Sequence, residues 1–162
     1  MEHVFAQKSV KINEAERKDW VKRHKRVAES RLKYANKELV REINELLKQM
    51  EEYISNNNNF DFLFSEYLRL IETPEGDNVD DIGNLALLGL IENIKLQNDS
   101  FFDKRRKIIE MVESGRNIPV GTERVFFKSF PETGTSLDYW SKEDGIKYVN
   151  YMQQIVFAKE SE

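Results

Sequence analysis

Hydrophobic residues recur every three or four positions from residue 39 to residue 54. This stripe consists of Leu39, Val40, Ile43, Leu46, Leu47, Met50, Tyr53 and Ile54. Such spacing lines one face of an α-helix, so the segment is predicted to be an amphipathic helix. Asn36 is the predicted N-cap, and the asparagine run 56–59 predicts where the helix ends.

A second apolar stretch, residues 60–71, predicts another helix that ends at Thr73-Pro74-Glu75-Gly76, where proline and glycine favour a turn. Residues 82–90 read Ile-Gly-Asn-Leu-Ala-Leu-Leu-Gly-Leu. This run is too short for periodicity to separate a buried strand from a helix, and both readings stay open.

The C-terminal part shows two capping patterns, Ser100 to Asp103 and Ser141 to Asp144. The first predicts a helix that stops near Gly115. The second opens a helix whose apolar positions keep helical spacing almost to the end of the chain: Ile146, Val149, Met152, Ile155 and Val156. Residues 14–34 lack glycine and proline, which favours a further helix. The predicted fold is mainly α with a small β element (α+β), in one domain over residues 1–162.

Charge is unevenly distributed along the chain. The net charge is −4, but residues 1–50 carry 13 Lys/Arg against 8 Asp/Glu, and residues 51–100 carry 2 against 11. The acidic total excludes a uniformly basic nucleic-acid binder and leaves two local basic patches, residues 18–33 and 104–107. With 40% hydrophobic residues, the chain has enough apolar material to build a core.

The chain contains no cysteine. A disulfide framework, a thiolate nucleophile and a cysteine-ligated zinc or iron–sulfur site are therefore excluded. No apolar run has the length of a signal peptide or a membrane span, so we expect a soluble, cytoplasmic protein without a membrane partner.

Few residues are candidates for chemistry. His24 lies within Lys22-Arg23-His24-Lys25-Arg26 and is expected to be an exposed surface residue. His3 is either part of a frayed terminus or a general base, a role that suits imidazole at neutral pH. Asn84, inside the apolar run 82–90, is either a turn or strand-end cap or part of a site, and Asn93 is either a helix-capping or turn residue or part of a site.

Several segments, taken in order, resemble one family. They are Glu2-His3-Val4-Phe5-Ala6-Gln7, Ile82-Gly83-Asn84-Leu85-Ala86-Leu87-Leu88, the downstream Asn93, Ile118-Pro119 through Lys128, and Trp140, Asp144 and Tyr148 at steps of four. This order resembles the C-terminal HNH (His-Me finger) nuclease domain of GmrSD-like, modification-dependent restriction endonucleases. The resemblance covers residues 2–7 and most of 79–155, and residues 14–72 fit as a helical insertion.

The resemblance implies a ββα-metal core and a metal-dependent DNA endonuclease of a restriction or phage-defence type. His3 is then the general base, Asn84 orients it, and Asn93 holds the metal or its water. Glu2 offers a carboxylate to the ion, and oxygen ligands suit Mg²⁺ or Mn²⁺. The DNA phosphates are contacted by Lys104, Arg105, Arg106 and Lys107.

The sequence departs from the family at its start and at one motif position. Two residues precede His3, so the strand that normally carries this histidine is expected to be truncated, which predicts a degenerate, inactive core as one outcome. Ala86 replaces the usual threonine. The family's N-terminal nucleotide-dependent domain is not found in these residues, and we expect either such a domain or a companion protein to be encoded upstream. The alternatives are a noncatalytic nucleic-acid-binding remnant and a helical interaction module.

Overall fold

A computed structural model of the chain describes residues 2–4, 12–72, 82–96, 99–130 and 136–158. Its helices are α1 (Glu14–Arg31), α2 (Lys37–Asn56), α3 (Phe60–Tyr67), α4 (Leu90–Leu96), α5 (Phe101–Glu113), α6 (Val120–Phe127) and α7 (Lys142–Ala158). Its strands are β1 (Glu2–His3) and β2 (Leu85–Ala86). Two short 3-10 helices, η1 (Leu32–Tyr34) and η3 (Ile82–Asn84), and one π-helix, η2 (Leu68–Glu72), complete the described elements. The prediction of a mainly α fold with a small β element is confirmed.

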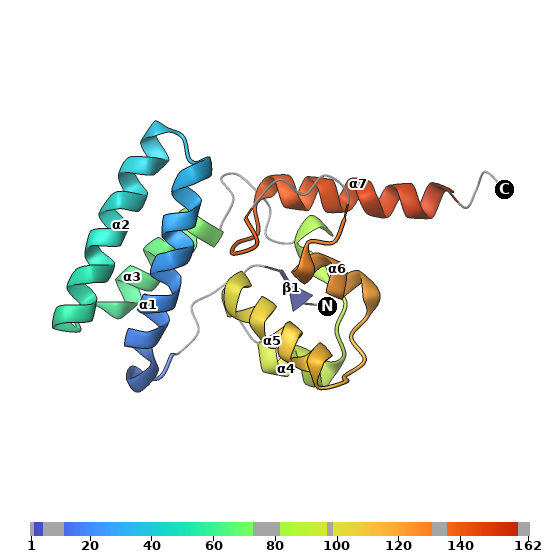
Figure 1. The fold of residues 1–162 in the computed structure, drawn as a ribbon, viewed down its shortest axis with the longest axis horizontal. Coiled ribbons are helices and arrows are strands. Elements are labelled where there is room, and N and C mark those ends of the chain that lie inside the picture. Colours follow the sequence, from blue (N-terminus) through green and yellow to red (C-terminus); the bar gives the residue numbers. More distant parts are fainter. Residues whose placement is uncertain (1, 5–11, 73–81, 97–98, 131–135, 159–162) are drawn as a thin grey trace.

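Residues 12–72 form a helical block in which α1 and α2 run antiparallel, with α3 packed against α2 (Figure 1). The sequence signals for α2 are confirmed. The Asn36 side chain accepts a hydrogen bond from the Leu39 N–H at 2.9 Å, and Asn57 ends the helix with a left-handed φ of 61°. The core of this block includes Trp20, Ile43, Met50, Phe64 and Tyr67. The helical block occupies the segment that the resemblance treats as an insertion.

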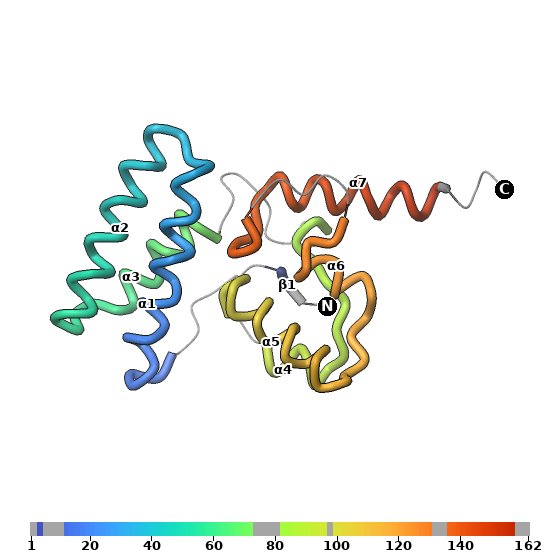
Figure 2. The backbone as a smooth tube through the Cα atoms, viewed as in Figure 1, coloured from blue at the N-terminus to red at the C-terminus, as the bar shows by residue number. Residues whose placement is uncertain are grey.

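The remaining described residues form a strand-bearing half, which lies beside the helical block (Figure 2). Here β1 pairs antiparallel with β2, with His3 opposite Leu85. The chain then continues into α4, so residues 82–90 combine a turn, a strand and the start of a helix. A second core closes this half, built from Val4, Ala86, Leu96, Phe101, Ile108, Met111, Ile118, Val125, Phe126, Phe130, Trp140 and Tyr148.

The predicted start and end of α5 and the predicted start of α7 are confirmed. The Ser100 hydroxyl accepts the Asp103 N–H at 3.2 Å, and Gly115 follows the helix with φ 76°. At α7, the Ser141 hydroxyl accepts the Asp144 N–H, and the Asp144 carboxylate accepts the Ser141 N–H at 2.8 Å. Ser141 and Asp144 form both bonds of a capping box, and Ser100 and Asp103 form one of the two.

The backbone of η3 lies directly against α7. A Cβ added to Gly83 would lie 3.0 Å from the Gly145 carbonyl oxygen, and the Trp140 indole N–H donates to the Gly83 carbonyl at 3.2 Å. A side chain at this position would press on the α7 backbone, so glycine suits this close approach. The buried face of α7 carries Asp144 and Tyr148, whereas Ile146 is 52% exposed. The helical spacing of the apolar residues therefore located the helix but not its inward face.

Within the described ranges, no helix is both long and apolar enough to span a membrane. The predicted turn at residues 73–76 lies outside the described residues.

Candidate functional site

The strand pair places His3 beside Asn84. His3 is opposite Leu85 in the ladder, and the Val4 N–H donates to the Asn84 carbonyl oxygen at 2.7 Å. Asn84 is buried, with 3% of its surface exposed, and His3 is partly exposed. Two residues far apart in the sequence therefore meet at one strand pair, with the histidine accessible and the asparagine enclosed.

Asn93 lies on α4, the helix that follows β2. Its side-chain oxygen Oδ1 is buried and has no hydrogen-bond partner among the residues that the structure describes. An unsatisfied buried amide oxygen is costly, so such an atom indicates a missing partner. Glu2 belongs to β1 by its backbone, and its side chain lies outside what is described.

The oxygen donors among these residues are of a type that suits a divalent metal ion, but they do not form a complete coordination sphere. The free amide oxygen of Asn93 is a hard ligand of the kind that Mg²⁺ and Mn²⁺ accept. In the described parts of the chain, no three His, Asp or Glu side chains gather to hold an ion. Mg²⁺ is commonly bound through one or two protein groups and several waters, so the donors present fit that ion in a water-rich shell.

The predicted basic cluster 104–107 differs from our expectation at its first member. Lys104 is 0% exposed, and its ammonium group donates to the His3 carbonyl oxygen at 2.6 Å. It is therefore not a surface cation and has no access to a DNA phosphate. Helical geometry explains the correction, because Lys104 and the core residue Ile108 lie one turn apart on the same face of α5.

The other three cations of the cluster remain at or near the surface. Arg106 is exposed and pairs with Glu110 at 2.9 Å. Lys107 pairs with Asp99 at 2.6 Å and donates to the Lys95 carbonyl. Arg105 is half-buried, and its Nε has no hydrogen-bond partner in the described part of the chain. Much of the positive charge in this cluster is thus already matched within the protein.

The prediction that His24 is exposed is wrong. Its ring is fully buried and stacks on Trp20 with ring centroids 3.8 Å apart. His24 Nδ1–H donates to the Trp20 carbonyl at 2.8 Å, which leaves Nε2 to accept the Ser100 hydroxyl at 2.7 Å. Burial lowers the pKa of His24 to about 3, so the ring is neutral at physiological pH.

His24 belongs to a buried polar junction between the two halves, which also includes Tyr67, Glu72, Ser100 and Asp103. The Glu72 carboxylate accepts the Phe101 N–H at 3.0 Å and the Tyr67 hydroxyl at 3.5 Å. Burial raises the pKa of Glu72 to about 7, although the positive charge of Lys104 acts in the opposite direction. The only signals for this junction in the sequence are the cap at Ser100 and the spacing of Trp20 and His24.

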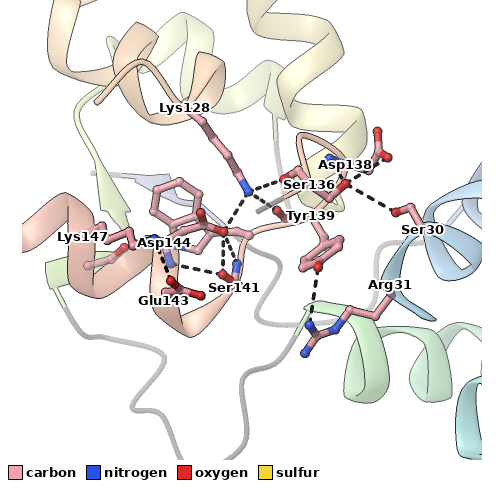
Figure 3. Close-up of polar contacts among 12 residues, drawn as sticks. Ser30, Arg31, Lys128, Ser136, Asp138, Tyr139, Ser141, Glu143, Asp144 and Lys147 are labelled. Atoms are coloured by element: carbon pink, nitrogen blue, oxygen red, sulfur yellow. Dashed lines mark hydrogen bonds and ion pairs between the residues drawn. The ribbon is translucent and has the colours of Figure 1, made fainter. Parts of the chain in front are cut away.

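The motif residues Lys128 and Asp144 form a fully buried ion pair with an Nζ–Oδ2 distance of 2.8 Å (Figure 3). Lys128 also donates to the backbone carbonyls of Tyr139, at 2.6 Å, and Ser136. Burial lowers the pKa of Lys128, and the negative charge of Asp144 opposes that change. These contacts join the end of α6 to the start of α7, so this pair supports the fold around the strands.

The chain was compared with protein-family models, curated proteins and solved structures, and none of the three comparisons finds a match.

Proposed function

We propose that this chain is a metal-dependent DNA endonuclease domain of a restriction or defence type. The observation that supports this best is the order of strand, strand and helix that brings His3 beside Asn84 and follows them with Asn93. A strand pair and a helix are the core that the resemblance to HNH nucleases implies. The segments that carry the resemblance also pack together in the strand-bearing half. The Trp140 indole donates a hydrogen bond to the Gly83 carbonyl, and Lys128 forms an ion pair with Asp144.

Each residue has a defined task in this proposal. The His3 imidazole removes a proton from the attacking water, and Asn84, held by the strand pair, orients that imidazole. Asn93 Oδ1 and the Glu2 carboxylate hold the ion or its water. When bound, the divalent ion supplies charge that stabilises the phosphorane and the leaving oxygen.

A plasmid-nicking assay tests the proposal. Supercoiled plasmid is incubated with the protein and Mg²⁺ or Mn²⁺, and conversion to open circles is followed on a gel. We expect nicking that EDTA abolishes and that the His3→Ala variant loses. Asn58→Ala, which changes an exposed asparagine between α2 and α3, is the matched control and should retain activity. A plasmid that stays intact both with Mg²⁺ and with Mn²⁺ would contradict the proposal.

A second function, noncatalytic nucleic-acid binding, has a separate observation in its favour. Lys18, Arg26 and Lys33 on α1 and η1 have no carboxylate partner among the described residues, and Arg26 and Lys33 are exposed. Such unmatched cations release counterions from DNA when they bind it. This function predicts binding of duplex DNA that weakens steeply with salt in the absence of any metal ion.

Fluorescence anisotropy of a labelled duplex at several salt concentrations separates the two functions. Replacing Lys18, Arg26 and Lys33 together by glutamine should reduce the slope of log affinity against log salt by about 0.9 for each lost phosphate contact. Nicking that persists at low salt in this variant favours the strand site as the centre of activity. Binding without nicking in the wild type favours the second function.

A further inference from the structure

Lys104 links two elements that are distant in sequence, α5 and β1. It lies in the first turn of α5, its side chain is completely buried, and its ammonium group reaches the backbone carbonyl of His3 at 2.6 Å. Removing an ammonium group from water is expensive unless it gains strong hydrogen bonds or an opposite charge. The bond to the His3 carbonyl is one such hydrogen bond, and the positive charge of Lys104 also acts on the Glu72 carboxyl group, whose pKa it lowers against the larger effect of burial.

The partner of this lysine, β1, is as short as the strand with which it pairs. Strand β1 has two residues, so its ladder with β2 contains few hydrogen bonds. A two-stranded pair of this length is marginal by itself, and it needs additional contacts to keep a fixed position. A hydrogen bond from a charged donor is stronger than a bond between neutral groups, so the Lys104–His3 bond strengthens the attachment of β1.

The position of β1 determines where the histidine side chain lies. Val4 N–H binds the Asn84 carbonyl on one side of His3, and Lys104 binds the carbonyl of His3 itself. The single peptide group that joins His3 to Val4 is therefore held at both its N–H and its C=O by bonds to other elements. A base that must approach a water within hydrogen-bond distance depends on such preorganisation.

We propose that Lys104 is a positioning residue that holds His3 in its working place beside Asn84, and that it does not contact DNA. The catalytic part of this inference, an effect of Lys104 on the rate of DNA cleavage, rests on the proposed nuclease function. Its structural part, the anchoring of β1 by Lys104, is independent of any activity. The two parts can therefore be tested separately on the same variants.

The structural part is tested by amide hydrogen exchange of the full chain, with Lys104→Met as the main variant. Methionine keeps the length and the apolar stem of the side chain and removes the donor. We expect the Val4 amide, which binds Asn84, to exchange about 10-fold faster or more in this variant, a change that reflects local opening of β1. The Ile108 amide, in the centre of α5, should keep its rate within about twofold, as expected for opening confined to β1.

The matched control is Ile108→Val, which removes one methylene from a fully buried residue of the same helix. It lowers the stability of α5 and leaves the Lys104–His3 bond intact. If Ile108→Val accelerates exchange at Val4 as much as Lys104→Met does, the anchoring role is wrong. Should Lys104→Met fail to fold, Lys104→Gln, which retains a neutral donor, gives the same comparison with an intermediate rate expected.

The catalytic part is tested by plasmid nicking together with DNA affinity measured without metal. A positioning role predicts that Lys104→Met lowers kcat about 10- to 100-fold and leaves the dissociation constant for DNA within about twofold. The opposite pattern, weaker DNA binding with unchanged kcat, would show that Lys104 contacts phosphate and would overturn the proposal. If the wild-type protein does not cut DNA, the nuclease proposal fails, and hydrogen exchange still decides whether Lys104 anchors β1.

Discussion

The ring of His24 and the hydroxyl of Ser100 meet across the boundary between the two halves, with Nε2 and Oγ 2.7 Å apart. Because the Trp20 carbonyl takes the only ring proton of the neutral imidazole, Ser100 donates to His24. The same serine caps α5. One hydroxyl therefore connects the helical block to the helix that carries Lys104.

We predict that His24 makes the protein less stable as the pH falls from about 6.5 to about 3. The pKa of His24 is lowered to about 3 in the folded state, so in this window the unfolded chain binds a proton that the folded chain does not. Stability then rises with pH by about 1.4 kcal/mol per unit from this group. Replacing His24 by Gln should remove that slope from urea unfolding measured between pH 4.5 and 6.5.

Glu72 is predicted to have the opposite effect over an overlapping window. Its pKa is raised to about 7, so the folded chain holds a proton between about 4.5 and 7 that the unfolded chain has lost. Stability from this group is complete below pH 4.5 and falls by about 1.4 kcal/mol per unit as the pH rises. Glu72→Gln should therefore steepen the rise of stability with pH, whereas His24→Gln should reduce it. Equal pH profiles for the two variants would contradict both assignments.

We predict that Asp144→Ala lowers the free energy of unfolding by about 3–5 kcal/mol. The variant breaks the buried ion pair with Lys128 and removes half of the cap of α7. Ile146→Ala, two residues further along the same helix at an exposed position, is the control and should change stability by less than about 0.5 kcal/mol. Chemical denaturation of the two variants side by side provides the measurement.

The two glycines that touch between η3 and α7 are predicted to respond differently to alanine. At Gly83 the new Cβ would press on the Gly145 carbonyl oxygen at 3.0 Å, so Gly83→Ala should cost about 1–3 kcal/mol. At Gly145 the nearest atom would be 3.4 Å away, an ordinary contact, and alanine favours a helix by up to about 1 kcal/mol over glycine. Thermal unfolding should show a lower Tm for Gly83→Ala and an unchanged or higher Tm for Gly145→Ala.

For the candidate site, we predict that Asn93 sets the metal requirement. Asn93→Ala removes the buried unpartnered oxygen, so the Mg²⁺ or Mn²⁺ concentration for half-maximal nicking should rise about 10-fold or more. Asn93→Asp keeps an oxygen ligand and should require no more metal than the wild type. Equal metal dependence of the alanine variant and the wild type would exclude Asn93 as a ligand.

The sequence predicted those features that depend on neighbouring residues. The cap at Asn36, the stop at Asn57, and the serines before α5 and α7 were recognisable because each bond spans a few residues. The helical content followed from periodicity for the same reason.

The inward positions of charged residues were not predictable from local pattern. His24 and Lys104 both lie in strongly basic runs, which are typical of exposed surfaces. Their burial depends on partners far away in the sequence, Ser100 for His24 and the His3 carbonyl for Lys104. The pairing of His3 with the segment at Asn84 was expected only from the resemblance, because no periodicity connects positions so distant.

The pairing of residue 3 with residue 85 has a consequence for folding and for inactivation. Closing so long a loop carries an entropy cost. Prior folding of α1, α2 and α3 brings the ends of that loop closer together and reduces this cost. The strand pair is therefore expected to form late. By the same reasoning β1 is expected to be the first element to detach under mild denaturation, since its ladder with β2 has two residue pairs. If the proposed nuclease function is correct, nicking activity should therefore disappear at lower urea concentrations than the helical circular dichroism signal.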